Sequence, residues 1–145
     1  MTSTITAANM TVTVSESITL NGRQQGGNQT QTVSSIAEIS KRIMTITTNE
    51  ATIATFSAAV AAAGRYNDSA VKYMRFSNLD DTNFLTLTFT NTDNDEVAIK
   101  LDAGNSFMWF ADNSGGMVDV MNAIDAVSGG AASDTDLEPI KTIKA

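Results

Sequence analysis

The sequence predicts an all-β protein, and two observations carry this prediction. Charged residues make up only 17% of the chain, against about a quarter in a typical domain, and Thr, Ser and Asn fill the deficit. Thr is β-branched and suits the solvent face of a strand, whereas helical proteins cover their surfaces with Glu, Lys and Gln. Segments of alternating apolar and polar residues also recur roughly every 8–12 residues with turn residues between them, which is typical of an antiparallel sandwich or barrel.

Length and charge narrow the class of protein. The chain has 145 residues, the size of one domain, so we expect residues 1–145 to form a single β-sandwich domain. Its formal net charge of −7 argues against binding to nucleic acid, whose phosphates repel an acidic surface. No run of about 18 apolar residues occurs, so we expect no membrane span. The first nine residues do not resemble a secretory signal, so we expect the chain to stay in a cytoplasm or to be assembled there.

The composition excludes several kinds of catalytic and metal site. The chain has no histidine, which removes Ser-His-Asp and Cys-His sites together with the commonest general base. It also has no cysteine, which removes disulfides, zinc–thiolate sites, iron–sulfur clusters and thiol nucleophiles. We therefore expect a protein that is not an enzyme, with no catalytic residue, no cofactor and no metal site.

The clearest strand covers residues 10–20. Thr and Ser fill one parity there, and the other parity carries the apolar set Met10, Val12, Val14, Ile18 and Leu20. Only Glu16 breaks the apolar side, and such an alternation predicts a half-buried strand. Asn21 and Gly22 then predict a turn, and the glycine-containing residues 24–28 predict a flexible loop.

Two further strands are expected over residues 30–36 and 41–48. Residues 49–64 fit either a helix or a strand. Asn49 as an N-cap, a glycine after the last turn and the alanines in between favour a helix, whereas the β-rich surroundings favour a strand. We expect a strand over residues 51–57.

The β pattern returns strongly in the second half of the chain. Strands are expected at residues 71–77, 85–90, 97–101, 107–110 and 137–145. Polar turns at residues 78–81, 91–95 and 102–105 separate them.

One short helix is expected near the C-terminal third, over residues 116–127. The residues on its apolar face are Met117, Val120, Met121, Ile124 and Val127. Residues 128–136 are small, polar and glycine-containing, and predict a linker to the last strand.

Acidic side chains offer one remaining route to a functional site. Asp93, Asp95 and Glu96 suggest part of a calcium-binding loop, but Ala98 stands where an EF-hand loop needs glycine. We therefore interpret these residues as an acidic hairpin tip.

Other catalytic patterns are also accounted for by turns. Asp80 and Asp81 are interpreted as turn formers that hydrogen-bond their own backbone, and a weak calcium site between adjacent loops stays open as the alternative there. A pair of carboxylates for glycoside hydrolysis would need one acid in an apolar setting, and nearly all the acids fall in predicted turns. The glycine pairs lack the setting and the lysine of a phosphate loop.

The densest apolar stretch is residues 107–110. In a half-buried strand one parity faces solvent, so either the core covers both faces or another subunit contacts one of them. Because Trp and Met are favoured at the centres of interfaces, we name Met108, Trp109 and Phe110 as candidate interface residues. Core packing is the alternative.

Two stretches of the sequence resemble small structural proteins of tailed bacteriophages. The first, VKYMRFSNLDDTNFLTL from Val71, carries the pattern R-x-x-N-L-D-x-T-N-[FY]-[VL]-x-L. The second, IKLDAGNSFMWF from Ile99, carries an L-x-x-G-x-S turn before an aromatic strand. The opening strand that ends at Asn21-Gly22 and the closing IKTIKA fit the same plan, so the resemblance covers about two thirds of the chain.

The resemblance implies a jelly-roll-like antiparallel β-sandwich in a virion, assembled in the host cytoplasm. It implies a structural protein that acts by adhesion: a capsid decoration or cement protein, or a minor head or tail component. The partners implied are the major capsid protein or another virion protein, and further copies of the chain in a trimer or dimer. No catalytic residue carries over. The alternative function is a receptor- or glycan-binding domain of a tail fibre or bacterial surface, which would need a shallow aromatic and polar pocket.

Overall fold

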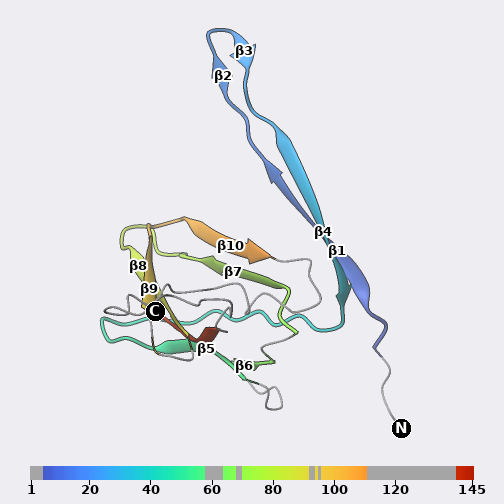
Figure 1. The fold of residues 1–145 in the computed structure, drawn as a ribbon. Helices are drawn as coiled ribbons and strands as arrows, with labels where there is room; N and C mark the ends of the chain where they lie inside the picture. The colour runs from blue at the N-terminus through green and yellow to red at the C-terminus, as the bar shows by residue number, and fades with distance from the viewer. Residues whose placement is uncertain (1–4, 58–63, 68–69, 92–93, 95, 111–139) are drawn as a thin grey trace, which may run out of the picture. The chain divides into compact units, whose positions relative to one another are not determined.

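Eleven strands and no helix make up the part of the chain that the computed structural model describes: residues 5–57, 64–67, 70–91, 94, 96–110 and 140–145. The all-β prediction is therefore confirmed for these residues (Figure 1). The strands are β1 (Ala8–Ser15), β2 (Thr19–Leu20), β3 (Arg23–Gln24), β4 (Asn28–Ile36), β5 (Thr52–Phe56), β6 (Arg65–Tyr66), β7 (Tyr73–Ser77), β8 (Leu85–Asn91), β9 (Glu96–Leu101), β10 (Ser106–Phe110) and β11 (Ile140–Lys144). The chain divides into two compact units, Met1–Arg42 with β1 to β4 and Ile43–Ala145 with β5 to β11. The expectation of one sandwich domain over residues 1–145 stays a prediction.

The first unit contains a long hairpin, residues 8–36. Strands β1 and β4 pair antiparallel, and β2 pairs with β3 next to the turn. One register runs through both pairs, from Met10 opposite Val33 to Leu20 opposite Arg23. Between the pairs, the amide of Glu16 donates to the carbonyl of Gly27 over 2.8 Å, so the ladder continues there. The predicted strand over residues 10–20 is thus confirmed except for residues 16–18, which lie between β1 and β2.

Two local features set the ends of the long hairpin. At the tip, Asn21 and Gly22 have φ values of 52° and 76°, as a two-residue hairpin turn of type I′ requires, so the predicted turn is confirmed. At the base, a β-bulge shifts the register between Ala8 and Met10. The extra residue belongs to β4, where Ser34 and Ser35 together lie opposite Asn9. Ser35 has a φ of 57°, and its amide donates to Asn9 Oδ1 over 3.3 Å. The side chain of Asn9 thus satisfies an amide that the bulge removes from the ladder.

The second unit contains a five-stranded sheet in the order β6-β5-β11-β8-β9 and a two-stranded sheet of β7 and β10, here called the β7–β10 ribbon. The C-terminal strand β11 lies between β5 and β8 and is antiparallel to both. Its Ile143 is fully buried. A turn at residues 102–105 leads from β9 into β10, as predicted, and Gly104 supplies the positive φ of 73° there.

The core of the second unit contains residues of both of these sheets. Phe89 of β8 is fully buried, and its ring centroid lies 6.3 Å from Phe76 in β7, 5.7 Å from Phe107 and 6.3 Å from Trp109 in β10. All three ring pairs meet edge-to-face, an arrangement worth about 0.5–1.5 kcal/mol per pair beyond the buried area. Phe89 therefore connects the five-stranded sheet to the β7–β10 ribbon.

Residues 41–48 do not form the strand that the sequence predicts. The segment has no ladder partner among the described residues, and Ile43 is 81% exposed. Strand propensity measures how well a side chain fits a pleated, half-buried surface, and a segment without a paired neighbour has no such surface. By contrast, the strand expected over residues 51–57 is confirmed as β5. The expected helix over residues 116–127 and the linker at residues 128–136 lie outside the described residues.

Candidate interaction surfaces

The β7–β10 ribbon has one apolar face in the core and one face of mixed character. Its register places Met108 opposite Arg75 and Phe110 opposite Tyr73. The core-facing residues, which alternate with these, are Met74, Phe76, Phe107 and Trp109. We call Tyr73, Arg75, Met108 and Phe110 the outer face of the ribbon. Arg75 is exposed, Met108 is 39% exposed, and the two aromatic residues are half-buried.

The three predicted interface residues therefore lie on two different faces. Trp109 packs against Phe89 in the core, which agrees with the alternative of core packing that the sequence left open for residues 107–110. Met108 and Phe110 lie on the outer face. Sequence reasoning did not single out Tyr73 and Arg75. Their place beside Phe110 and Met108 depends on the register of two strands that are about 30 residues apart, and alternation within a single strand does not determine this register.

A hydrogen-bonded turn continues from the end of the outer face. The hydroxyls of Ser77 and Ser106 lie 2.7 Å apart across the ribbon. Next to them, the buried Asn78 donates from Nδ2 to the carbonyl of Asn83 over 2.8 Å and to that of Leu101 over 3.1 Å. The turn is thereby tied to β9, which gives the ribbon a fixed end.

Asp80 is occupied by the backbone of this same turn. Its Oδ1 accepts from the amide of Thr82 over 2.8 Å and from that of Asn83 over 2.7 Å. These hydrogen bonds hold the pKa of the Asp80 carboxyl below its ordinary value, and the bond from the Asn83 amide has the largest effect. The interpretation of Asp80 as a turn former is confirmed.

The described residues contain no group of three or more Asp and Glu side chains that could hold a metal ion. Asp93 and Asp95, which with Glu96 suggested a calcium-binding loop, lie outside the described residues. Glu96 accepts from the hydroxyl of Thr90 over 3.2 Å and lies 3.9 Å from Nζ of Lys144, so its carboxylate is engaged within the sheet.

The second surface is the apolar stripe of the long hairpin. Because one register runs through the hairpin, the alternating apolar residues of residues 10–20 share a single face: Met10, Val12, Val14, Ile18 and Leu20. Val14, Ile18 and Leu20 are exposed, and Met10 and Val12 are half-buried. The opposite face carries Thr and Ser, with the hydroxyls of Thr13 and Thr30 3.3 Å apart.

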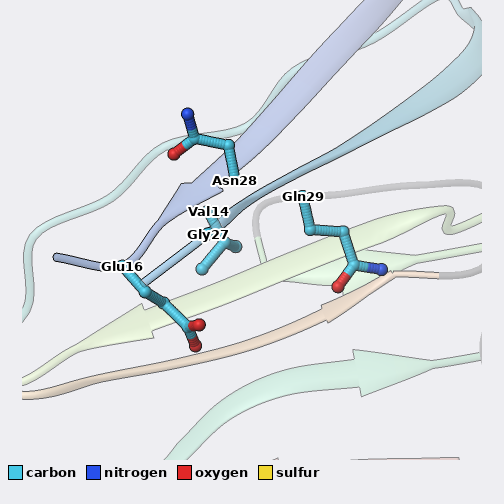
Figure 2. Close-up of a pocket in the computed structure, with 5 residues that line it drawn as sticks. All are labelled: Val14, Glu16, Gly27, Asn28 and Gln29. Carbon is cyan, nitrogen blue, oxygen red and sulfur yellow. The ribbon is translucent and has the colours of Figure 1, made fainter. Parts of the chain in front are cut away.

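Two hollows flank this stripe. One hollow, of about 170 Å³, lies halfway along the hairpin against Val14 and Gly27. There the side chains of Glu16 and Gln29 extend to one side of the hairpin and that of Asn28 to the other (Figure 2). The other, of about 300 Å³, lies at the base of the hairpin. We call it the base hollow; its aliphatic lining consists of Ile5, Ala8, Met10, Ile36, Ala37 and Ile39.

The sequence matches no protein family, and neither a curated protein nor a solved structure is similar to it. The described part of the chain contains no helix with the length and hydropathy that a membrane span requires.

Proposed function

We propose that this protein is a virion structural protein of a tailed bacteriophage, a capsid decoration or cement protein that binds and stabilises the shell through protein–protein contacts. The observation that carries the proposal is the outer face of the β7–β10 ribbon. It combines Tyr73, Arg75, Met108 and Phe110, four residue types that are enriched at protein interfaces. The expected partner is the major capsid protein or another virion protein.

The packing of the ribbon's inner face supports this role. On the other side of the same two strands, Met74, Phe76, Phe107 and Trp109 pack against the core, so the outer face is held in place before any partner binds. A preorganised surface loses less conformational entropy on association than a flexible one. Permanent assembly in a particle also suits a chain with few charged residues.

We further propose that the second unit is a jelly-roll-like sandwich, in which the five-stranded sheet and the β7–β10 ribbon form the two layers. The edge-to-face contacts of Phe89 with Phe76, Phe107 and Trp109 support this arrangement, since they connect the two sheets through one core. Facing sheets of a sandwich pack about 10 Å apart with interdigitated side chains.

The first experiment is mass spectrometry of particles purified on a density gradient, with the copy number measured against the major capsid protein. We expect one copy per capsid subunit or a simple fraction of it. A dozen copies or fewer would assign the protein to the neck, tail or fibres. Absence from particles would overturn the virion proposal, and binding to a glycan array would then support the receptor-binding alternative.

A second experiment tests the outer face itself. Particles that lack the protein are incubated with purified wild-type chain or with the double variant Arg75→Ala/Met108→Ala, and the bound fraction is measured by sedimentation. We expect the double variant to bind about tenfold to thirtyfold more weakly, the range for central interface residues. Val97→Thr in β9 is the matched control, because Val97 is about as exposed as Met108. Equal binding of the double variant and the wild type would exclude the outer face as the contact.

A further inference from the structure

We propose that the long hairpin is a self-association surface on which two copies of the chain pair antiparallel, so that the tip of each hairpin lies against the base of the other. This inference goes beyond the proposed function and does not depend on it. The occupant of the surface is a second copy of this chain, because tip and base complement each other in shape, in hydropathy and in charge.

The tip presents aliphatic side chains to solvent. Ile18 and Leu20 lie on the same face two residues apart, and Leu20 is 60% exposed. Exposed aliphatic residues that occur singly are common, but these two share their face with Val14, Val12 and Met10 farther down the strand. The exposed Glu16 interrupts the stripe between Val14 and Ile18, so the tip and the base are two apolar patches on one face.

The base provides a hollow for such side chains. Met10 belongs both to the apolar stripe and to the lining of the base hollow, so the two surfaces are continuous. Ile5 and Ile39, which also line the hollow, are exposed, and Ile39 is the most exposed large apolar residue that the structure describes, at 82%. An aliphatic side chain placed in the hollow would remove these groups from water.

Opposite charges also lie at the two ends. Arg23 is paired with Leu20 at the tip, and Glu38 lines the base hollow. Both residues are exposed. When the tip of one copy lies in the base hollow of another, Arg23 of one comes near Glu38 of the other, and such complementarity fixes register and partner choice more than affinity.

An antiparallel pair satisfies both ends at the same time. Leu20 and Ala8 are twelve residues apart along one strand direction, which corresponds to about 40 Å of hairpin. This separation is the same in both copies, so a two-fold axis through the middle of the stripes places each tip against the opposite base. Such a closed, isologous contact is the commonest arrangement in homo-oligomers.

The exposed apolar area is of the size that a dimer requires. Five large aliphatic residues are exposed among the described residues of the first unit: Ile5, Val14, Ile18, Leu20 and Ile39. At about 100 Å² for a fully exposed side chain, these residues present roughly 300 Å² in each copy. A standard interface buries about 800 Å² per partner, of which somewhat more than half is apolar. The apolar stripe and the base hollow therefore supply most of that apolar part.

The oligomeric state of the purified chain tests the proposal directly. We expect sedimentation velocity over a concentration series to show a monomer–dimer equilibrium, and Leu20→Asn to raise the dissociation constant at least tenfold. Leu79→Asn is the control, because Leu79 is still more exposed than Leu20 but lies in the second unit. A wild-type chain that stays monomeric at all concentrations overturns the proposal, as does an equal effect of the two substitutions.

A charge exchange tests the pairing of tip and base. We expect Arg23→Glu and Glu38→Arg each to weaken association about threefold to tenfold, and the double variant to restore it. If the single substitutions weakened association by disrupting the fold, the double variant, which carries both changes, would not recover it. If the double variant is weaker than either single variant, tip and base do not meet.

Disulfide cross-linking tests the antiparallel direction, and the natural chain contributes no cysteine to the background. We expect a mixture of the variants Leu20→Cys and Ile39→Cys to give a mixed disulfide dimer under mild oxidation. A rapid cross-link within Leu20→Cys alone would show a tip-to-tip contact and overturn the antiparallel arrangement. The outcome is independent of the virion proposal, because a chain that dimerises can be absent from particles and a monomer can be present in them.

Discussion

Two regions of this protein carry the same sequence pattern in different surroundings. In β8, the alternating residues Leu87 and Phe89 are fully buried, and they belong to a core to which the β7–β10 ribbon contributes. In β1, Met10 and Val12 alternate with Thr just as regularly, but they are only half-buried, and Val14 after them is exposed. Alternation thus identifies a strand with one apolar face and does not say what covers that face.

The two regions are also stabilised in different ways. The five-stranded sheet obtains its stability from side chains that meet within the chain, whereas in the long hairpin only Val33 of β4 is fully buried and the ladder and the turn supply the rest. An isolated two-stranded hairpin is marginally stable in water, and its exposed apolar face is the part that a partner can stabilise. This contrast leads us to propose the hairpin as a contact surface.

The largest expected effect is that of removing the ring at the centre of the core. Phe89→Ala should lower the free energy of unfolding of the second unit by about 3–5 kcal/mol, because it deletes a buried ring and three ring contacts. Ile18→Ala in the hairpin should cost less than about 0.5 kcal/mol in dilute protein, where self-association does not contribute. Urea unfolding followed by tryptophan fluorescence measures the loss in the second unit, since Trp109 contacts Phe89, and amide hydrogen exchange in β1 measures the loss in the hairpin. Equal losses for the two variants would contradict the comparison.

A smaller effect is expected at a glycine of the long hairpin. A Cβ at Gly26 would overlap the carbonyl oxygen of Glu16 and lie 2.9 Å from the Cα of Ser17, whereas a Cβ at Gly27 would meet nothing within 4 Å. Gly26→Ala should therefore disrupt the ladder next to the tip, at a cost of about 1–3 kcal/mol, and Gly27→Ala should leave the ladder intact.

Amide hydrogen exchange distinguishes this local effect from a global one. In Gly26→Ala we expect faster exchange at the amides of Glu16 and Gln25, which bond to Gly27 and Ile18 across the hairpin. Amides of β8 and β11 should keep their protection. Uniformly faster exchange, or the same change in Gly27→Ala, would show that the close approach of Gly26 to Glu16 is not what the hairpin depends on.

The sequence allows most strands to be predicted, since turns and alternation are local signals. The type I′ turn at Asn21-Gly22 and the turn around Asp80 follow from side chains that act on their own backbone. The failure at residues 41–48 has the opposite cause: Ile43 and its neighbours have strand propensity, but a strand also needs a paired neighbour, which no local pattern reveals.

The candidate site was only half predictable for the same reason. Met108 and Phe110 were found from the composition of a single strand, which also led to Trp109 on the opposite face. Tyr73 and Arg75 join the outer face through the register of β7 with β10. In the same way, the base hollow brings Ile5 next to Ile39 through the pairing of β1 with β4.

The smallest effect we expect concerns pH and the turn that anchors the β7–β10 ribbon. Because backbone amides hold the pKa of Asp80 below its ordinary value, its charged form stabilises the folded state above the pKa of the unfolded chain. That contribution is lost as the pH falls through the lower pKa of the folded state. Asp80→Asn keeps an oxygen that accepts from Thr82 and Asn83 but removes the charge. The melting temperature of the variant should therefore lie below that of the wild type at pH 7, and the difference should shrink as the pH is lowered below about 4. A difference that stays constant down to pH 2 would mean that the carboxylate charge contributes nothing, and that the turn is held by the geometry of the side chain alone.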